Sequence, residues 1–439
     1  MSKRLILVLA LAFVVGIAFA AYAEVQNVKV SGDITVYGIA RDNYSVAGSG
    51  GGRVLTLTGA QTESRDNYMT ATRLRIDADL TDNVAATVRL INERDWGVAD
   101  DVYTNATDTT TNRNSNIDLD LAYVTLKEFL YSPMTLKVGK QDLRIGSGLV
   151  IGDGVLTDPA GLLESDMSSR KAFDAIVALL DYDPLTLVLG IAKLSEAPQG
   201  TTDDTDAYIF DAVYKFKDYN AVADLSYILA HDSSSPTATS ATSTLLKGGN
   251  THIMDLRLTA QPIKNLSTEL EYAREFGDYA IGRSLNAWAL TAGANYAFAG
   301  VKYSPALGLK YDYRSGEEAG TTTGDHSAWK ALYEDQVNGV IYDPNTNISI
   351  IKVSGSMKPM EDIILAADYY NYRYAEKLVA SAASKGKKDA GDELDLSLTY
   401  NYTEDVSFGL LGAMFWPGSD YIPDNKKATE ILGSMKVTF

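Results

Sequence analysis

Charged residues recur at every second position in several segments of this sequence. Arg73, Arg75 and Asp77 show the spacing, with apolar Leu74 and Ile76 between them. In an extended chain, alternate side chains point to the same face, so these charges would share one face and the apolar residues the other. Guanidinium groups in a row can bind carboxylates through paired hydrogen bonds and transfer them from one site to the next.

The same parity assigns further charged residues to the polar face, which we expect to line a water-filled lumen and to contact solutes. These candidate pore-lining residues are Arg41, Arg73, Arg75, Asp77, Arg89, Arg170, Asp174, Arg257, Asp312, Arg314, Glu393 and Asp395. Acids near the arginines at even spacing would hold them extended: Asp77 for Arg73 and Arg75, Asp174 for Arg170, and Asp312 for Arg314. The alternative is that the charges are structural pairs, because a wet interior needs polar side chains in any case.

Catalysis has little support in the residue types present. The three histidines, His231, His252 and His326, fall in or beside expected loops, and no Ser-His-Asp arrangement or metal-ligand spacing occurs. We therefore expect no enzyme activity, no bound metal and no cofactor.

The alternation that positions these charges is clearest from Glu393 to Tyr402. Glu393, Asp395, Ser397, Thr399 and Asn401 alternate there with leucines and tyrosines. This pattern predicts strands with one wet and one apolar face.

Strands with this pattern follow one another along most of the chain. Eighteen are predicted, at 28-41, 67-80, 84-96, 116-128, 134-144, 169-182, 185-194, 206-217, 219-231, 251-261, 266-277, 285-299, 303-314, 347-358, 362-375, 391-403, 405-416 and 428-439. Long polar links such as 42-66, 97-115, 232-250 and 315-346 alternate strictly with tight turns such as Thr81-Asp82-Asn83, Asp183-Pro184 and Thr403-Glu404. This predicts an all-β, transmembrane, antiparallel up-and-down β-barrel of 18 strands, with periplasmic termini and extracellular long links.

The N-terminus indicates export. Lys3 and Arg4 precede an apolar run from Leu5 to Ala23 that ends in Ala21-Tyr22-Ala23, which is typical of a signal peptide at residues 1-23, followed by a barrel domain at 24-439. An uncleaved helical anchor is the alternative. The chain has 39 basic and 57 acidic residues; without Lys3 and Arg4, 37 basic residues remain and the formal charge is −20, which argues against nucleic acid as a partner.

The other end of the chain and its aromatic residues also suit an outer membrane. Phe439 shares an outward face with Val437 and Met435, and a terminal aromatic of this kind resembles the signal read by the barrel assembly machinery. Tyrosine and tryptophan near strand ends would form interfacial girdles facing lipid and lipopolysaccharide. The examples are Tyr369, Tyr370, Tyr372, Tyr374, Phe415 and Trp416.

Four sets of segments together resemble the alginate export family of outer-membrane proteins. They are 136-144 leading into 146-152, 170-175, 311-317, and 391-396 with 415-418. Lys140 and Ser147 depart from the family pattern, where Arg and Asp are expected. The resemblance implies an 18-stranded barrel with a charged lumen, through which an anionic exopolysaccharide such as alginate leaves the periplasm, together with periplasmic export partners. A general diffusion porin, or a structural or adhesive surface barrel with a plugged lumen, remains open.

Overall fold

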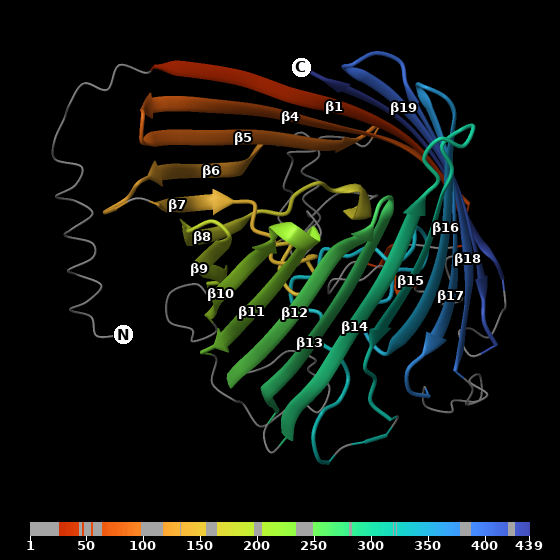
Figure 1. Ribbon diagram of the computed structural model, residues 1–439. Helices are drawn as coiled ribbons and strands as arrows, with labels where there is room; N and C mark the ends of the chain where they lie inside the picture. The colour runs from red at the N-terminus through yellow and green to blue at the C-terminus, as the bar shows by residue number, and fades with distance from the viewer. Residues whose placement is uncertain are drawn as a thin grey trace, which may run out of the picture.

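A closed antiparallel sheet of 18 strands forms the wall of the protein (Figure 1). The computed structural model describes residues 26–43, 46–47, 54–55, 64–97, 117–131, 133–154, 165–196, 204–233, 249–280, 283–318, 320–321, 323–377, 388–419 and 426–439, so the expected signal peptide lies outside the described residues. The barrel strands are β1 (Asn27–Asp42), β4 (Arg65–Thr81), β5 (Val84–Asp95), β6 (Asp118–Lys127), β7 (Met134–Gln141), β8 (Phe173–Asp181), β9 (Leu185–Ser195), β10 (Thr205–Phe216), β11 (Ala221–Asp232), β12 (Gly249–Ile263), β13 (Leu266–Ala280), β14 (Arg283–Ala297), β15 (Ala306–Arg314), β16 (Ile348–Met360), β17 (Ile363–Tyr374), β18 (Asp389–Asn401), β19 (Val406–Pro417) and β20 (Ala428–Thr438).

The first strand closes the barrel. Each barrel strand pairs with its sequence neighbours, and β1 also pairs with the last strand, β20, so that Asp33 lies opposite both Arg73 and Thr438. The expected 18-stranded up-and-down barrel is confirmed. Two short strands, β2 (Val46–Ala47) and β3 (Val54–Leu55), and two 3-10 turns, η1 (Ser165–Met167) and η2 (Lys217–Tyr219), are the other elements described. No helix in the described ranges is long and apolar enough to cross a membrane.

The two ends of the barrel differ in their links. One end carries the start of β1, the end of β20 and most of the tight turns, and the other carries the long links, which we number L1 to L9 in chain order. L3 (142–172) joins β7 to β8, and L7 (315–347) joins β15 to β16. The expected strict alternation of link lengths is wrong at one place: only residues 281 and 282 join β13 to β14 at the long-link end, whereas 298–305 join β14 to β15 at the other. The first link is short because β13 and β14 stay paired as far as Ala280 and Arg283.

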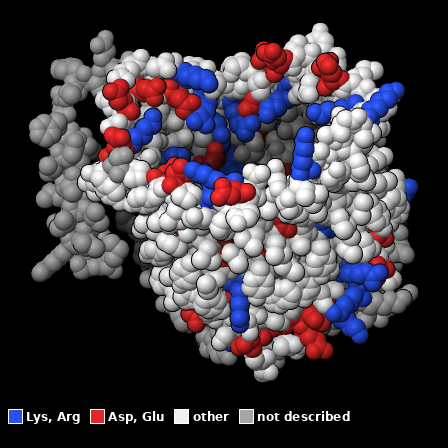
Figure 2. Space-filling model, in the orientation of Figure 1, with Lys and Arg blue, Asp and Glu red and all other residues white. Residues whose placement is uncertain are grey.

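The two faces of the wall follow the predicted parity over most of the sheet. Leu396 on β18 is 53% exposed on the outside, whereas Asp395 beside it is 5% exposed inside. The middle of the outer wall in Figure 2 carries few charged side chains, which gather instead around the hollow and toward the ends. An apolar outer band is what a lipid-facing barrel requires.

Part of the predicted aromatic girdle lies inside the barrel instead. Tyr370, Tyr372, Tyr374 and Phe415 are buried on the inner face, where they pack with Ile341 and Tyr342 of L7 in an apolar cluster. Tyr369 and Trp416 alone of the six face outward, 42% and 40% exposed. Alternation along the strands separates the two groups, because neighbouring residues on a strand point to opposite faces. Tyr369 therefore faces outward and Tyr370 inward.

A second apolar cluster covers the inner face of β8 to β14. Residues of L3, among them Leu149 and Ile151, pack there with Trp329 and Tyr333 of L7 on wall residues such as Val177 and Ile209. The two loops therefore fold into the barrel and bury a large part of its inner wall. Burial of this apolar surface is the main force that can hold long polar links inside a water-filled lumen.

Candidate functional site

Arg73, Arg75 and Arg89, three of the predicted pore-lining residues, form a row on the inner face of β4 and β5. Arg75 and Arg89 lie directly opposite one another on the two strands. Arg73 Nε donates to Asp33 of β1 at 2.9 Å, and Arg75 Nε donates to Asp77 Oδ2 at 2.8 Å. These acids hold the guanidinium groups extended, while 24% of the Arg73 side chain and 36% of the Arg75 side chain remain exposed to the lumen.

A β-bulge on β6 supplies the acid for Arg89. The register shifts so that Arg89 lies opposite Leu121 while Leu90 lies opposite Leu119, which leaves Asp120 as the extra residue. Asp120 therefore turns inward beside Leu121, and Arg89 Nε donates to its carboxylate at 2.5 Å. Bulges re-aim side chains in this way next to functional sites.

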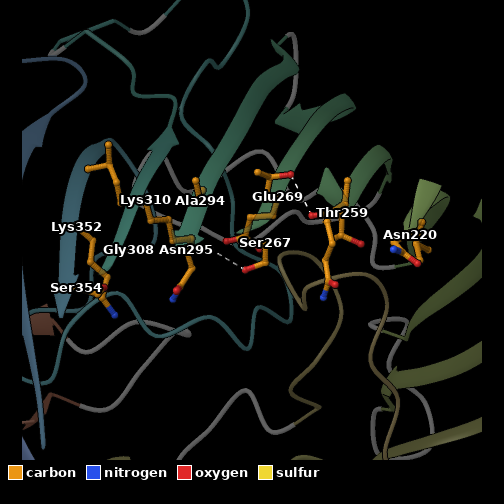
Figure 3. Close-up of a pocket in the computed structure, with 16 residues that line it drawn as sticks. Asn220, Thr259, Ser267, Glu269, Ala294, Asn295, Gly308, Lys310, Lys352 and Ser354 are labelled. Carbon is orange, nitrogen blue, oxygen red and sulfur yellow. Dashed lines mark hydrogen bonds between the residues drawn. The ribbon is translucent and has the colours of Figure 1, made fainter. Parts of the chain in front are cut away.

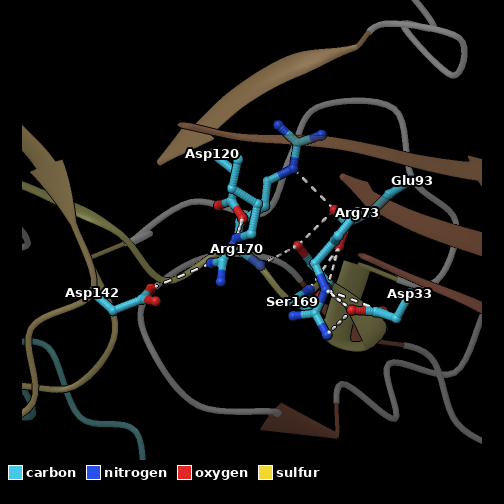
Figure 4. Close-up of polar contacts among 9 residues, drawn as sticks. Asp33, Arg73, Glu93, Asp120, Asp142, Ser169 and Arg170 are labelled. Carbon is cyan, nitrogen blue, oxygen red and sulfur yellow. Dashed lines mark hydrogen bonds and ion pairs between the residues drawn. The ribbon is translucent and has the colours of Figure 1, made fainter. Parts of the chain in front are cut away.

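Arg170 reaches the same row from L3. Its Nε donates to Glu93 of β5 at 2.9 Å (Figure 4), and it also forms an ion pair with Asp118 of β6. The backbone N–H of Ser169 donates to the second oxygen of Glu93 at 2.7 Å. The partner expected from sequence, Asp174, is wrong: it lies across from Lys193 and Lys140 on the outer face of β8, because the inner face there carries Phe173, Ala175 and Val177 packed against L3.

Two of the predicted arginines are inside the barrel but cannot meet a solute. Arg41 is 2% exposed and pairs with Glu430 of β20 and Asp166 of L3. Arg314 is fully buried beneath L7, where its Nη2 donates to Glu334 at 2.6 Å. Burial raises the pKa of Glu334 to about 7, against the lowering effect of Arg314. Both arginines anchor loops to the wall.

L3 and L7 are clasped together across the lumen. Ile151 and Tyr333 form a parallel bridge, and the backbone N–H of Asp335 donates to the carbonyl of Gly148 at 2.8 Å. The Asp335 carboxylate accepts from both Arg144 and Lys171 of L3. Gly148 has φ +81, a left-handed conformation that suits glycine, and a Cβ there would meet the Arg144 guanidinium at 2.9 Å.

Glu393 of β18 binds the backbone of L7. Its carboxylate accepts the N–H groups of Val340, Ile341 and Tyr342 at 2.7, 2.8 and 2.9 Å. Since Glu393 is wholly buried, this predicted pore-lining residue is a loop anchor. Asp395, two residues further on, is 5% exposed beside it.

The wall opposite the arginine row carries buried acids. Asp255, Glu271 and Glu275 on β12 and β13 are 3%, 1% and 0% exposed. The tip of L3 covers Asp255 and Glu271, with the Ser147 N–H 3.4 Å from Glu271 Oε1. Glu275 lies under L7, where it accepts the backbone N–H of Lys330 at 2.9 Å. Arg257 lies in the same area, 26% exposed and 4.0 Å from Glu269. Asp312 is also buried, accepting from Thr291 at 2.6 Å.

Two cavities lie along the inner face of the described part of the wall. The larger, of about 610 Å³, crosses β11 to β16 and includes Lys310 and Lys352 (Figure 3). These lysines pair with Asp312 and Asp368. The smaller, of about 300 Å³, lies between β18–β20 and β1–β4 and reaches Arg73 and Ser169. It adjoins the arginine row, so the exposed arginines and this cavity together make the candidate solute pathway.

The wall and the inward loops define an outer-membrane barrel with a charged, constricted lumen. The alginate export family profile matches residues 55–433 of the sequence. The chain therefore belongs to the alginate export family, as its sequence segments suggest, and it is an outer-membrane channel for hydrophilic solutes or alginate. No curated protein sequence matches it.

Solved structures with the same fold come from Pseudomonas aeruginosa. OpdQ aligns with a TM-score of 0.57 at 14% identity, over 95% of this chain and 99% of its own. The outer membrane protein opdK aligns with a TM-score of 0.57 at 12% identity, over 94% of this chain and all of its own. At these identities the likeness shows the fold alone.

Several residues of the pathway escaped sequence reasoning. Asp335, Lys171 and Arg144 come from links, where period-2 parity has no meaning, and Lys436 of β20 is not among the predicted pore-lining residues. The structure also shows where Lys140 and Ser147 lie, the two residues that depart from the family pattern. Lys140 faces outward across from Asp174, so it does not change the lumen. Ser147 Oγ accepts from Gln336 of L7 at 2.5 Å, and its backbone N–H points to Glu271, where an Asp would add to the buried acids.

Proposed function

We propose that this channel favours anionic hydrophilic solutes, which pass along Arg73, Arg75, Arg89 and Arg170 beside L3. Guanidinium groups suit this task, because they bind carboxylates in two parallel hydrogen bonds yet stay charged at any physiological pH. Each of these arginines also pairs with an acid of the protein, which competes with the solute. The solute is therefore bound weakly enough to be released, as conduction requires.

The observation that carries this proposal is the difference in exposure between acids and arginines. Acids outnumber bases in the sequence, but Asp255, Glu271, Glu275 and Glu393 are at most 3% exposed under L3 and L7. The side chains of Arg73, Arg75, Arg89 and Arg170 are 24%, 36%, 14% and 19% exposed. A solute in the lumen thus meets the arginines, whereas the loops cover those four acids. The positive field of the arginines therefore acts on the solute at the narrow part of the lumen.

Family membership supports an anionic exopolysaccharide such as alginate as the cargo, with periplasmic export partners. We further propose that the protein acts as a channel without catalysis. Phe439 is 59% exposed on the outer face at the end of β20, which supports its proposed role as the signal for the barrel assembly machinery.

A plugged structural barrel is the second candidate, because the clasp between L3 and L7 crosses the lumen. The two candidates differ in conductance: a plugged barrel would give no ion current in a planar bilayer.

Reversal potentials in a KCl gradient test the ion preference. We expect the wild-type pore to favour anions, and the triple variant Arg73→Ser, Arg75→Ser, Arg89→Ser to shift toward cations. Arg274→Ser is the matched control, because Arg274 is exposed on the outer face, opposite Trp288. A wild-type pore that is already cation-selective, and that the triple variant leaves unchanged, contradicts the proposal.

A further inference from the structure

The outer faces of β5, β13 and β17 carry no charge from the tight-turn end of the barrel until an arginine is reached. On β5 the outward residues are valine, alanine, valine, leucine and asparagine, and Arg94 follows them. On β13 leucine, threonine, leucine and tyrosine precede Arg274, and on β17 isoleucine, leucine, alanine, tyrosine and asparagine precede Arg373. All three arginines are exposed.

The height of these arginines matches the edge of an apolar membrane band. Arg94 and Arg373 are each the eleventh residue of their strands, and Arg274 is the ninth. At about 3.3 Å per residue and a strand tilt of about 40°, they lie about 20–25 Å from the tight-turn end. The apolar band of such barrels is about 25 Å tall, and their long loops are extracellular. The arginines therefore lie where the headgroups of the outer leaflet begin.

These guanidinium groups have no acidic partner. In the described parts of the chain no carboxylate forms an ion pair with any of the three. Arg274 Nη2 donates to the side-chain oxygen of Asn286 at 3.1 Å, and Arg373 Nε donates to that of Asn371 at 3.4 Å. Asp392 of β18 accepts from Asn371 at 2.8 Å. Neutral amides thus orient two of the arginines and leave their charge available to an anion.

Other outward cations near this end of the wall face acids. Lys193 of β9 forms ion pairs with Glu196 at 2.7 Å and with Asp206 at 3.3 Å. Lys140 of β7 lies directly opposite Asp174. The wall therefore balances these lysines with its own carboxylates, whereas it leaves the three arginines without a counter-charge.

Aromatic rings flank two of the arginines on the outer face. Trp96 follows Arg94 two residues along β5, and it stacks on Tyr68 with the ring centroids 5.4 Å apart. Trp288 of β14 lies directly opposite Arg274. Such rings gather at the headgroup level of a membrane. Beside a cation, they offer an apolar face to the sugar of a glycolipid.

We propose that Arg94, Arg274 and Arg373 each bind a phosphate of one lipopolysaccharide molecule in the outer leaflet. A guanidinium group holds a phosphate through two parallel hydrogen bonds, and lipid A carries its phosphates on a sugar backbone. The sites are separate, because at least four strand spacings of about 4.8 Å each lie between any two of them. This surface is outside the barrel, so the inference does not depend on the solute that passes through the lumen.

Native mass spectrometry of the intact barrel in detergent tests this, with lipid A, dephosphorylated lipid A and phosphatidylglycerol as probes. Wild type should bind up to three lipid A molecules. Dephosphorylated lipid A should bind at least 10-fold more weakly, because it lacks the phosphates. Phosphatidylglycerol should also bind more weakly, because its phosphodiester carries one negative charge, whereas a phosphomonoester carries about two.

Substitution of the arginines tests their role directly. The triple variant Arg94→Gln, Arg274→Gln, Arg373→Gln should weaken lipid A binding about 10- to 100-fold, the usual effect of losing a charge-assisted hydrogen bond. Each single variant should lose one of the three bound lipids. The matched control Lys193→Gln removes an outward charge that acids already balance, and it should leave lipid A binding within about twofold.

Three results would overturn the proposal. One is equal binding of lipid A by wild type and the triple variant, and another is an effect of Lys193→Gln as large as that of a single arginine variant. The third is equal binding of lipid A and phosphatidylglycerol, which would indicate a general attraction for anionic lipids. Heat-modifiable gel mobility verifies that each variant is folded, and the single variants carry the test if the triple variant does not fold.

Discussion

Ile151 of L3 and Tyr333 of L7 form a parallel β-bridge inside the barrel, so the two loops constrict the lumen as one unit. Asp335, two residues after Tyr333, binds both Arg144 and Lys171 of L3. The constriction thus depends on contacts between loops that lie far apart in the sequence, and it can be loosened without altering the wall.

Asp335→Asn should loosen this clasp. The variant loses the charge that holds two cations, so L3 and L7 should separate more often and the single-channel conductance and its noise should both rise. Glu318→Gln is the control, since Glu318 is an exposed residue of the same loop. Unchanged conductance in Asp335→Asn would mean that the clasp does not limit the current.

Glu393→Gln should release the second half of L7 from the wall. A glutamine has one acceptor oxygen in place of two, so at least one of the three backbone N–H groups of Val340, Ile341 and Tyr342 loses its partner. We expect a loss of about 1–3 kcal/mol in the free energy of unfolding, together with faster proteolysis within L7. Asp392→Asn serves as the comparison, because Asp392 accepts from Tyr369 on the outer face and an asparagine can still accept. Equal losses in the two variants would contradict the anchoring role of Glu393.

Leu396→Arg should destabilise the barrel, because Leu396 faces lipid between Ala367 and Gly412 near the middle of β18. The expected loss is about 2–4 kcal/mol in the free energy of folding into vesicles if the residue lies at the bilayer midplane. Asp395→Asn, on the inner face, should be tolerated. Equal tolerance of both substitutions would reverse the assignment of the two faces.

Stability should rise with pH above about 8 through Lys330 of L7. Burial lowers the pKa of Lys330 to about 8, although Glu275 and Asp232 act in the opposite direction. Because the folded-state pKa is below the ordinary 10.5, the buried charge lowers the stability by its full amount below pH 8. This loss of stability disappears as the pH rises from about 8 to 10.5. The charge on Lys330 lowers the free energy of unfolding by at most about 3 kcal/mol.

Lys330→Met measures this effect by difference. The variant should be more stable than wild type at pH 7, and the gap should shrink at pH 10, as followed by urea unfolding at the two values. A gap that is constant between the two pH values would show that Lys330 does not titrate in this range.

The local pattern of the chain was sufficient to predict the wall of the barrel. Alternation along a strand is a property of neighbouring residues, so Glu393 and Asp395 could be assigned to one face and Leu394 and Leu396 to the other, and the strand count followed from the same signal. The even strand count also makes the first and last strands antiparallel, which is compatible with the pairing of β1 with β20.

Only the tertiary structure decided which inward residues meet the solvent. The rule that polar residues face inward failed at Asp174, because L3 lays apolar residues over that sector of the wall and the inner positions of β8 became apolar. Tyr372 and Phe415 were assigned to the lipid interface because they lie near strand ends, although alternation along the strands places them inside. Arg314 was assigned to the open lumen, although L7 buries it. Burial of these residues comes from loops distant in sequence that fold back into the barrel. A period of two along one strand carries no information about such contacts, because it records only which side of the wall a residue occupies.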